Sequence, residues 1–199
     1  MKVCIFEDEK VVDFFPITMT RATFEIRSGR TLLLEKILDF LGNPSEVCLY
    51  VRDYLAPVVE MRYPNFVVND LNFLKGDDAL FINGRWLCRG EKIDIGTDEA
   101  LYSDDNLVML KISKDSVEKV IEGNFLENMR KMAEKVGKDT LKTTVYNWPW
   151  EPVLMNKEVL KYDFERFGKR GLHGKILGKI EIVGDKEDVY IAPTAKVYP

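Results

Sequence analysis

Histidine is almost absent from this 199-residue chain, and cysteine is sparse. The single histidine, His173, excludes a multi-histidine metal centre and leaves little support for a Ser/His/Asp triad. The three cysteines are widely spaced, form no CxxC pair and each sit inside a short apolar run. Such spacing fits neither a zinc site nor a disulfide framework, so we expect buried thiols that pack as small apolar groups.

Long apolar runs and basic clusters are missing as well. No apolar stretch approaches the roughly 20 residues that a membrane-spanning helix needs. The carboxylates of Glu7 and Asp8 come too early for a secretory signal. A net charge of −4 without any basic run gives no reason to expect nucleic acid. The sequence therefore predicts a cytoplasmic globular protein that binds neither membrane nor nucleic acid.

Segments with the pattern of a strand alternate along the sequence with segments that have the pattern of a helix. Strands are expected at residues 3–6, 46–51, 66–68, 79–83, 86–88, 107–112 and 143–146. Helices are expected at residues 31–41, 54–62, 116–122, 124–136 and 154–167, the first capped by Ser28 or Thr31. Such alternation predicts an α/β fold with a mixed, mostly parallel sheet between helices.

The composition changes after residue 167. Glycines and basic residues over 168–179 are typical of a linker, and residues 179–184 alternate like a strand. Ile191 and Val197 lie six apart with the small Ala195 between them, which matches one hexad of a left-handed β-helix or an exposed terminal strand. We divide the chain into an α/β domain, 1–168, and a linker with a first β-helix coil, 169–199. Since one coil cannot bury its own face, the natural chain is expected to continue beyond Pro199.

An arginine-rich segment precedes the helix at 31–41. Arg21, Arg27 and Arg30 surround Gly29 there. Arginine guanidinium groups and the free N–H groups at the start of a helix can both donate hydrogen bonds to phosphate oxygens. This segment is therefore a candidate phosphate site. The alternative is a solvated basic loop that pairs with the carboxylates of Glu7, Asp8, Glu9 and Glu25.

Several motifs together carry a family resemblance. They are Phe-Glu-Asp-Glu at 6–9, Pro-Ile-Thr-x-Thr-Arg at 16–21, Glu-Ile-Arg-x-Gly at 25–29, Leu-Phe-Ile-Asn-Gly-Arg at 80–85, Trp-Pro-Trp-Glu at 148–151 and Asn-x-x-x-Leu-x-x-Asp-Phe at 156–164. The chain resembles sugar nucleotidyltransferase-like proteins related to the bifunctional N-acetylglucosamine-1-phosphate uridylyltransferase. The resemblance implies a Rossmann-like nucleotide-diphospho-sugar transferase fold in front of a left-handed β-helix acyltransferase-like domain.

The resemblance also implies a reaction. A sugar-1-phosphate attacks the α-phosphorus of a nucleoside triphosphate, with uridine or thymidine as the base and Mg²⁺ as cofactor. Arg21 and Arg27 are then expected to grip the phosphates, so that replacing either with alanine removes most turnover. Gly29 and Arg30 are expected to bind substrate beside them. Asn156 lies where related transferases place an asparagine near the metal, or is simply a helix N-cap.

Two departures from the transferase pattern stand out. Glu7-Asp8-Glu9 replaces a glycine-rich phosphate loop, and Asn83-Gly84-Arg85 stands where the superfamily has a glycine and a metal-binding aspartate. Three carboxylates would repel a triphosphate unless a divalent ion intervened, and an arginine cannot bind Mg²⁺ although it can replace part of its charge. Asn83 and Arg85 remain substrate-binding candidates, and Asp8 and Asp105 are candidate metal ligands.

Three functions stay open at this point. The first is nucleotidyl transfer that forms a UDP-sugar or a dTDP-sugar. The resemblance suggests UDP-N-acetylglucosamine as an example of the product. The second is a catalytically inactive module that binds a nucleotide or sugar and regulates its β-helix. The third places the activity, acyl transfer, in a hexapeptide-repeat β-helix beyond residue 199 that would assemble as a trimer.

Overall fold

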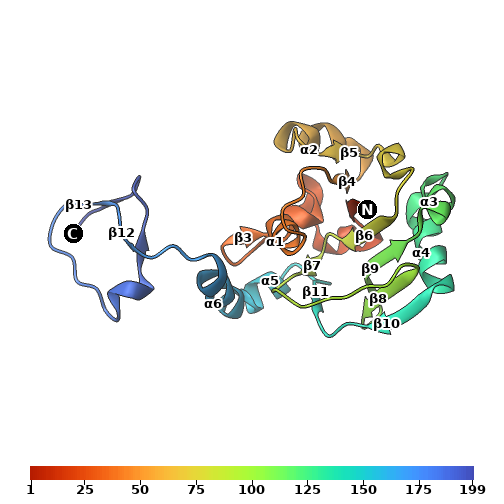
Figure 1. The fold of residues 1–199 in the computed structure, drawn as a ribbon. Helices are drawn as coiled ribbons and strands as arrows, with labels where there is room; N and C mark the ends of the chain where they lie inside the picture. Colours follow the sequence, from red (N-terminus) through yellow and green to blue (C-terminus); the bar gives the residue numbers. More distant parts are fainter.

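The computed structural model describes residues 1–199, apart from the side chain of Phe167. A seven-stranded sheet in the order β10-β8-β9-β6-β1-β4-β5 forms its centre (Figure 1). The strands are β1 (Lys2–Phe6), β4 (Cys48–Tyr50), β5 (Val67–Val68), β6 (Ala79–Asn83), β8 (Glu99–Ser103), β9 (Asn106–Ile112) and β10 (Gly137–Thr140). Only β9 runs antiparallel to its neighbours, which confirms the mixed, mostly parallel sheet.

Helices cover both faces of the sheet because successive strand residues point to opposite sides. In β1, Val3 and Ile5 pack into one core with α1 (Leu33–Phe40) and α2 (Ala56–Arg62). Cys4 and Phe6 pack into the other core with α3 (Lys114–Ile121) and α4 (Phe125–Lys135). A sheet with near-continuous apolar strands is buried on both sides in this way, and the result is three layers.

Smaller elements surround one end of the sheet. They are the hairpin β2 (Arg27–Ser28) and β3 (Thr31–Leu32), the pair β7 (Trp86–Leu87) and β11 (Thr144–Val145), and the helices α5 (Glu151–Leu154) and α6 (Asn156–Phe167). Short 3-10 helices at Glu9–Phe14, Ile17–Met19 and Thr23–Glu25 connect β1 to this hairpin, and others lie at Asp53–Leu55, Leu71–Leu74 and Lys186–Asp188.

The contact between α6 and the hairpin depends on Asp163. Its carboxylate pairs with the ammonium of Lys36 on α1, and both side chains are almost completely buried. It also accepts a 2.8 Å hydrogen bond from the backbone N–H of Arg30. One buried carboxylate thus joins α1, α6 and the turn between β2 and β3.

Four local predictions were wrong or incomplete. Leu32, rather than Ser28 or Thr31, is the N-cap of α1, and Glu35 accepts from its N–H at 2.6 Å. Met155 rather than Asn156 is the N-cap of α6. Residues 179–184 form no strand in the structure, and their alternating pattern has no pairing partner. The sequence reading also missed β8 and β10.

The chain beyond α6 lies apart from the sheet (Figure 1). Within it, β12 (Gly171–Leu172) pairs in parallel with β14 (Tyr190–Ile191), and β13 (Lys175–Ile176) with β15 (Lys196–Val197). The expected hexad at 191–196 runs from β14 to β15. These two short pairings make a single turn of chain and do not show a β-helix. Along the part of the chain that the structure describes, no helix is long and apolar enough to cross a membrane.

Candidate functional site at the sheet switch point

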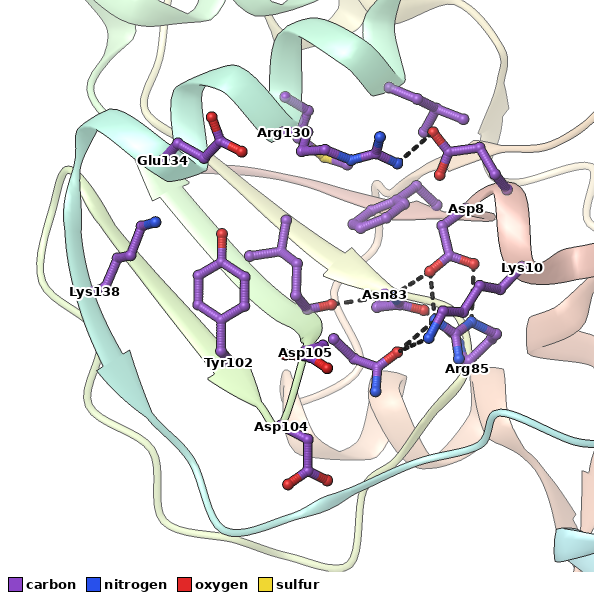
Figure 2. A pocket seen from close by; sticks show the side chains of 16 residues that line it. Asp8, Lys10, Asn83, Arg85, Tyr102, Asp104, Asp105, Arg130, Glu134 and Lys138 are labelled. Carbon is purple, nitrogen blue, oxygen red and sulfur yellow. Dashed lines mark hydrogen bonds and ion pairs between the residues drawn. The ribbon is translucent and has the colours of Figure 1, made fainter.

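The topology of the sheet places a crevice at the ends of β1 and β6. These strands are parallel neighbours, and Phe6 pairs in register with Asn83 at their carboxyl ends. The chain leaves β1 toward β4 on one side, whereas β6 lies on the other side, so the strand order reverses between them. Open α/β sheets bind ligands at such a switch point. A cavity of about 380 Å³ lies here, lined by residues that directly follow both strands (Figure 2).

The three carboxylates after β1 point to three different arginines. Glu7 pairs with Arg52 at 3.2 Å, Asp8 with Arg85 at 2.5 Å and Glu9 with Arg130 at 2.6 Å. The repulsion toward a polyanion that the sequence suggested is therefore largely neutralised within the protein. Glu25, on the next segment, likewise pairs with Arg62 at 2.9 Å.

Glu7 has a different role from its two neighbours. It is buried, and it accepts a 2.8 Å hydrogen bond from the backbone N–H of Thr23 and a 3.3 Å one from that of Arg52. Burial raises the pKa of the Glu7 carboxyl above its ordinary value, opposed by the adjacent Arg52 guanidinium. Arg52 in turn donates to the carbonyls of Thr18 and Arg21. Glu7 and Arg52 thus hold the segment that follows β1.

Asp8, Asn83 and Arg85 form a closed network on the floor of the cavity. The Arg85 Nε and Nη2 groups donate to the two oxygens of Asp8 at 2.8 and 2.5 Å. Asn83 donates to Asp8 Oδ2 at 2.9 Å and accepts from the backbone N–H of Arg85. The turn needs Gly84, because an added Cβ would lie 3.0 Å from the Phe6 carbonyl oxygen.

Lys10 and Arg85 share two acceptors in this network. The Lys10 ammonium donates to the side-chain oxygens of Asn106 and Asn147 at 3.0 and 3.1 Å. Arg85 donates to the same two oxygens at 3.1 and 3.3 Å. Two cations therefore lie side by side, and among the contacts described the carboxylate bonded to this pair is that of Asp8, which accepts from Arg85. The cavity is also lined by Glu9, Asp104, Asp105 and Glu134, so it is this pair of cations, rather than the lining as a whole, that suits an anion such as phosphate.

The opposite wall of the cavity comes from β8, β10 and α4 (Figure 2). Tyr102 on β8 lies beneath the Lys138 ammonium, which is 5.7 Å from the centre of its ring. Burial, followed by the charge of Glu134, raises the pKa of the Tyr102 hydroxyl. Arg130 and Glu134 extend from α4 into the same cavity.

The arginine-rich segment lies outside this cavity. Arg21 and Arg27 are exposed, and the Arg27 guanidinium donates to the carbonyl of Arg30 within its own hairpin. Gly29 has φ +68°, and an added Cβ would lie 2.6 Å from Asp163 Oδ2. Its need for glycine is therefore explained by the packing of α6.

The other sequence candidates are divided between the cavity and its surroundings. Asp105 lines the cavity from the exposed turn between β8 and β9, next to Asp104. Asn156 is the first residue of α6 and does not line this cavity. Trp148 and Trp150 stack on each other, with ring centres 5.1 Å apart, and stay about half exposed.

The donor set at the switch point fits Mg²⁺ poorly. Mg²⁺ is usually held by one or two carboxylates together with substrate phosphates. Both oxygens of Asp8 already accept hydrogen bonds from Arg85, and a second cation on Asp8 would lie against that guanidinium. Among the residues described, no group of three or more His, Cys, Asp or Glu side chains could hold a metal ion.

Sequence reasoning missed the residues that come from distant segments. Lys10 carried a weak signal, since it directly follows the Glu7-Asp8-Glu9 run after a buried strand. Tyr102, Asn106, Lys138 and Asn147 carried none, because only the sheet topology brings them to the end of β1.

The fold is that of nucleotidyltransferases. LicC, the CTP:phosphocholine cytidylyltransferase of Streptococcus pneumoniae, superimposes with a TM-score of 0.51 at 12% identity, covering 79% of this chain and 98% of that one. A Bacillus anthracis protein described as a glucose-1-phosphate thymidylyltransferase gives a TM-score of 0.56 at 9% identity, covering 80% and 95%. No curated protein sequence matches the chain.

The family follows from the sequence itself. A profile of the sugar nucleotidyl transferase family matches residues 3–170, which is most of the chain. The chain therefore belongs to the sugar nucleotidyl transferase family.

Proposed function

We propose that this protein is a sugar-1-phosphate nucleotidyltransferase that uses a pyrimidine nucleoside triphosphate, UTP or dTTP. The observation that carries the proposal is the pair of cations at the switch point, where Lys10 and Arg85 share two amide oxygens. Family membership supplies the reaction class. The thymidylyl and cytidylyl transfer named for the two similar structures favours a pyrimidine base.

The reaction forms one P–O bond and breaks another. A phosphate oxygen of the sugar-1-phosphate attacks the α-phosphorus, and the bond from that phosphorus to the β-phosphate oxygen breaks, releasing pyrophosphate. Negative charge accumulates on the phosphate oxygens, so positioned cations are the main catalytic requirement. We assign Lys10 to this role because, among the contacts described, its ammonium bonds to neutral amide oxygens and to no carboxylate, so that its charge is available to a phosphate.

Lys138 is the second cation that we assign to substrate. Among the contacts described, its ammonium faces the Tyr102 ring and no carboxylate, in contrast to Arg85 and Arg130. It lies across the cavity from Lys10 (Figure 2). We propose that the two lysines bind the two phosphate-bearing substrates from opposite walls, with the Tyr102 ring as an apolar surface for a sugar or base.

Pyrophosphate release tests the proposal. UTP, dTTP, CTP and ATP are each combined with N-acetylglucosamine-1-phosphate, glucosamine-1-phosphate or glucose-1-phosphate, with and without Mg²⁺. We expect turnover with one pyrimidine nucleotide. Lys10→Met and Lys138→Met should each reduce kcat/KM at least tenfold, since each removes a charge-assisted contact.

The same panel tests the arginine-rich segment as the alternative phosphate site. Arg21→Ala and Arg27→Ala remove most turnover if the arginine-rich segment binds phosphate. Lys131→Met, at an exposed position on α4, is the matched control for loss of a lysine. Full activity in both cavity variants, with loss in the arginine variants, would overturn the assignment to the cavity.

A binding module without catalysis is the second candidate. It is favoured by the closed network at Asp8, in which all five N–H groups of Arg85 already have acceptors. In that case no pair releases pyrophosphate, whereas a UDP-sugar or dTDP-sugar raises the melting temperature.

We further propose that residues 169–199 begin a left-handed β-helix, with 1–168 as the transferase-like domain. The parallel pairings of β12 with β14 and of β13 with β15 support this division. A longer chain that contains the following residues would test it, because a β-helix of this kind should assemble as a trimer in sedimentation. A monomer would count against this proposal and against acyl transfer there.

A further inference from the structure

The Asp8–Arg85 pair at the switch point is fixed more firmly than a substrate-binding arginine would be. The Arg85 side chain is only 1% exposed, and its five N–H groups all donate: to Asp8 twice, to Asn106, to Asn147 and to the carbonyl of Tyr146. A buried guanidinium that lost its carboxylate would be strongly unfavourable. Separating Arg85 from Asp8 would therefore be costly.

Asp8 has little capacity left for a metal. An ionised carboxylate offers about four acceptor positions, and three are occupied by Arg85 Nε, Arg85 Nη2 and Asn83 Nδ2. The other two carboxylates of the run are also paired, Glu7 with Arg52 and Glu9 with Arg130. A divalent ion on Asp8 would find a single free acceptor position and would lie against the Arg85 guanidinium.

We propose that the Arg85 guanidinium takes the place of a metal ion on Asp8, so that the protein binds its nucleotide without a divalent ion bridging the phosphates to Asp8. The inference rests on the proposed function. It adds that protein side chains, rather than a metal ion, supply the positive charge at the end of β1. Lys10, which shares two acceptors with Arg85, presents that charge to the phosphates.

Nucleotide binding in the absence of metal tests this directly. The dissociation constant of UTP, or of dTTP if the activity panel selects it, is measured by calorimetry in 5 mM MgCl₂ and in EDTA. We expect affinity in EDTA to be within about threefold of that in Mg²⁺, or tighter, because uncomplexed triphosphate carries more negative charge. Binding at least tenfold weaker in EDTA would overturn the inference. Absence of binding in both buffers would overturn the proposed function together with it.

Two variants separate the roles of charge and carboxylate. Arg85→Ser frees Asp8, so Mg²⁺ should strengthen UTP binding to this variant at least tenfold over EDTA. Lys10→Met removes one cation from the same network but frees no carboxylate, so its binding should weaken equally in both buffers. Mg²⁺-independent binding by a folded Arg85→Ser variant would contradict the proposal. If Arg85→Ser does not fold, the wild-type comparison still decides.

The remaining carboxylates of the cavity provide a further check. Asp105 lies on the exposed turn between β8 and β9. If Mg²⁺ strengthens binding to the wild-type protein tenfold and Asp105→Asn abolishes that gain, a metal bound at Asp105 would replace our proposal. We expect Asp105→Asn to leave the ratio between the two buffers within threefold of the wild-type ratio.

Discussion

The arginine-rich segment over residues 16–30 and the cavity at the end of β1 hold similar numbers of cations but use them differently. In the segment, the Arg27 side chain and the Arg30 backbone bind groups of the hairpin and α6. In the cavity, two lysines face no carboxylate among the described contacts, and two arginines neutralise the acids beside them. Charge that is dense in sequence can thus serve the fold, and among the cations that the topology brings together we propose only the two lysines for a ligand.

The largest expected effect concerns the anchor of the segment. Asp163→Ala leaves the Lys36 ammonium buried without a partner and removes the acceptor of the Arg30 N–H. We expect the free energy of unfolding to fall by about 3–5 kcal/mol, measured by urea denaturation. Glu165→Ala, an exposed position on the same helix, should change it by less than about 0.5 kcal/mol. Similar small effects from both would mean that α6 does not hold the segment.

Gly29 gives a second test of the arginine-rich segment, because the sequence predicts that it binds substrate there. Gly29→Ala places a Cβ at φ +68° against Asp163 and Val159. We expect a loss of about 2 kcal/mol in unfolding free energy, from backbone strain and overpacking. Nucleotide affinity of the folded variant should stay within threefold of wild type, measured by calorimetry. Normal stability with lost affinity would return Gly29 to the binding site.

Lys10 and Arg27 give the most direct contrast between the two regions. Lys10→Met should weaken nucleotide binding about tenfold, equivalent to about 1.4 kcal/mol. Arg27→Ala should change it less than threefold, since that side chain binds its own hairpin. The two dissociation constants, measured at one salt concentration, decide between the regions, and the reverse order would favour the segment.

The buried cysteine thiols carry no charge at neutral pH, unlike the charged side chains that line the cavity. Burial raises the pKa of Cys88 to about 12 and that of Cys4 well above its ordinary value. The thiols stay protonated in the folded state at pH values where they ionise in the unfolded chain. Their contribution to the free energy of unfolding is therefore fully present below about pH 9 and is lost as the pH rises toward 12. We expect about 1 kcal/mol less stability at pH 10 than at pH 8 from Cys88 alone, and the decrease should be smaller in Cys88→Ala. If the free energy of unfolding depended on pH equally in the variant and the wild type, Cys88 would not be the source of the decrease.

Much of the fold was predictable because its core strands are apolar and its helices are periodic. The expected strands at 3–6 and 79–83 and the helix at 124–136 correspond closely to β1, β6 and α4. The strand β10 could not be found in this way, since all four of its residues are exposed and none has an apolar side chain. Pairing with β8 creates it, and that pairing is a tertiary event.

The site was predictable only where it matches the transferase pattern. Asp8, Asn83 and Arg85 were named because they stand where the resembled transferases have a phosphate loop and a metal-binding aspartate, and the structure places them at the ends of β1 and β6. That Arg85 would neutralise Asp8 did not follow from the sequence, because 77 residues separate them. Tyr102 and Lys138 reach the cavity through the antiparallel return of β9 and the edge strand β10, which no local pattern indicates.

An amide NMR titration of the ¹⁵N-labelled protein with UTP or dTTP shows whether nucleotide binds at the end of β1. We expect the chemical shift changes to concentrate on residues 8–10, 83–85, 102–106 and 130–138. Changes confined to residues 21–30, with the cavity amides unmoved, would contradict it.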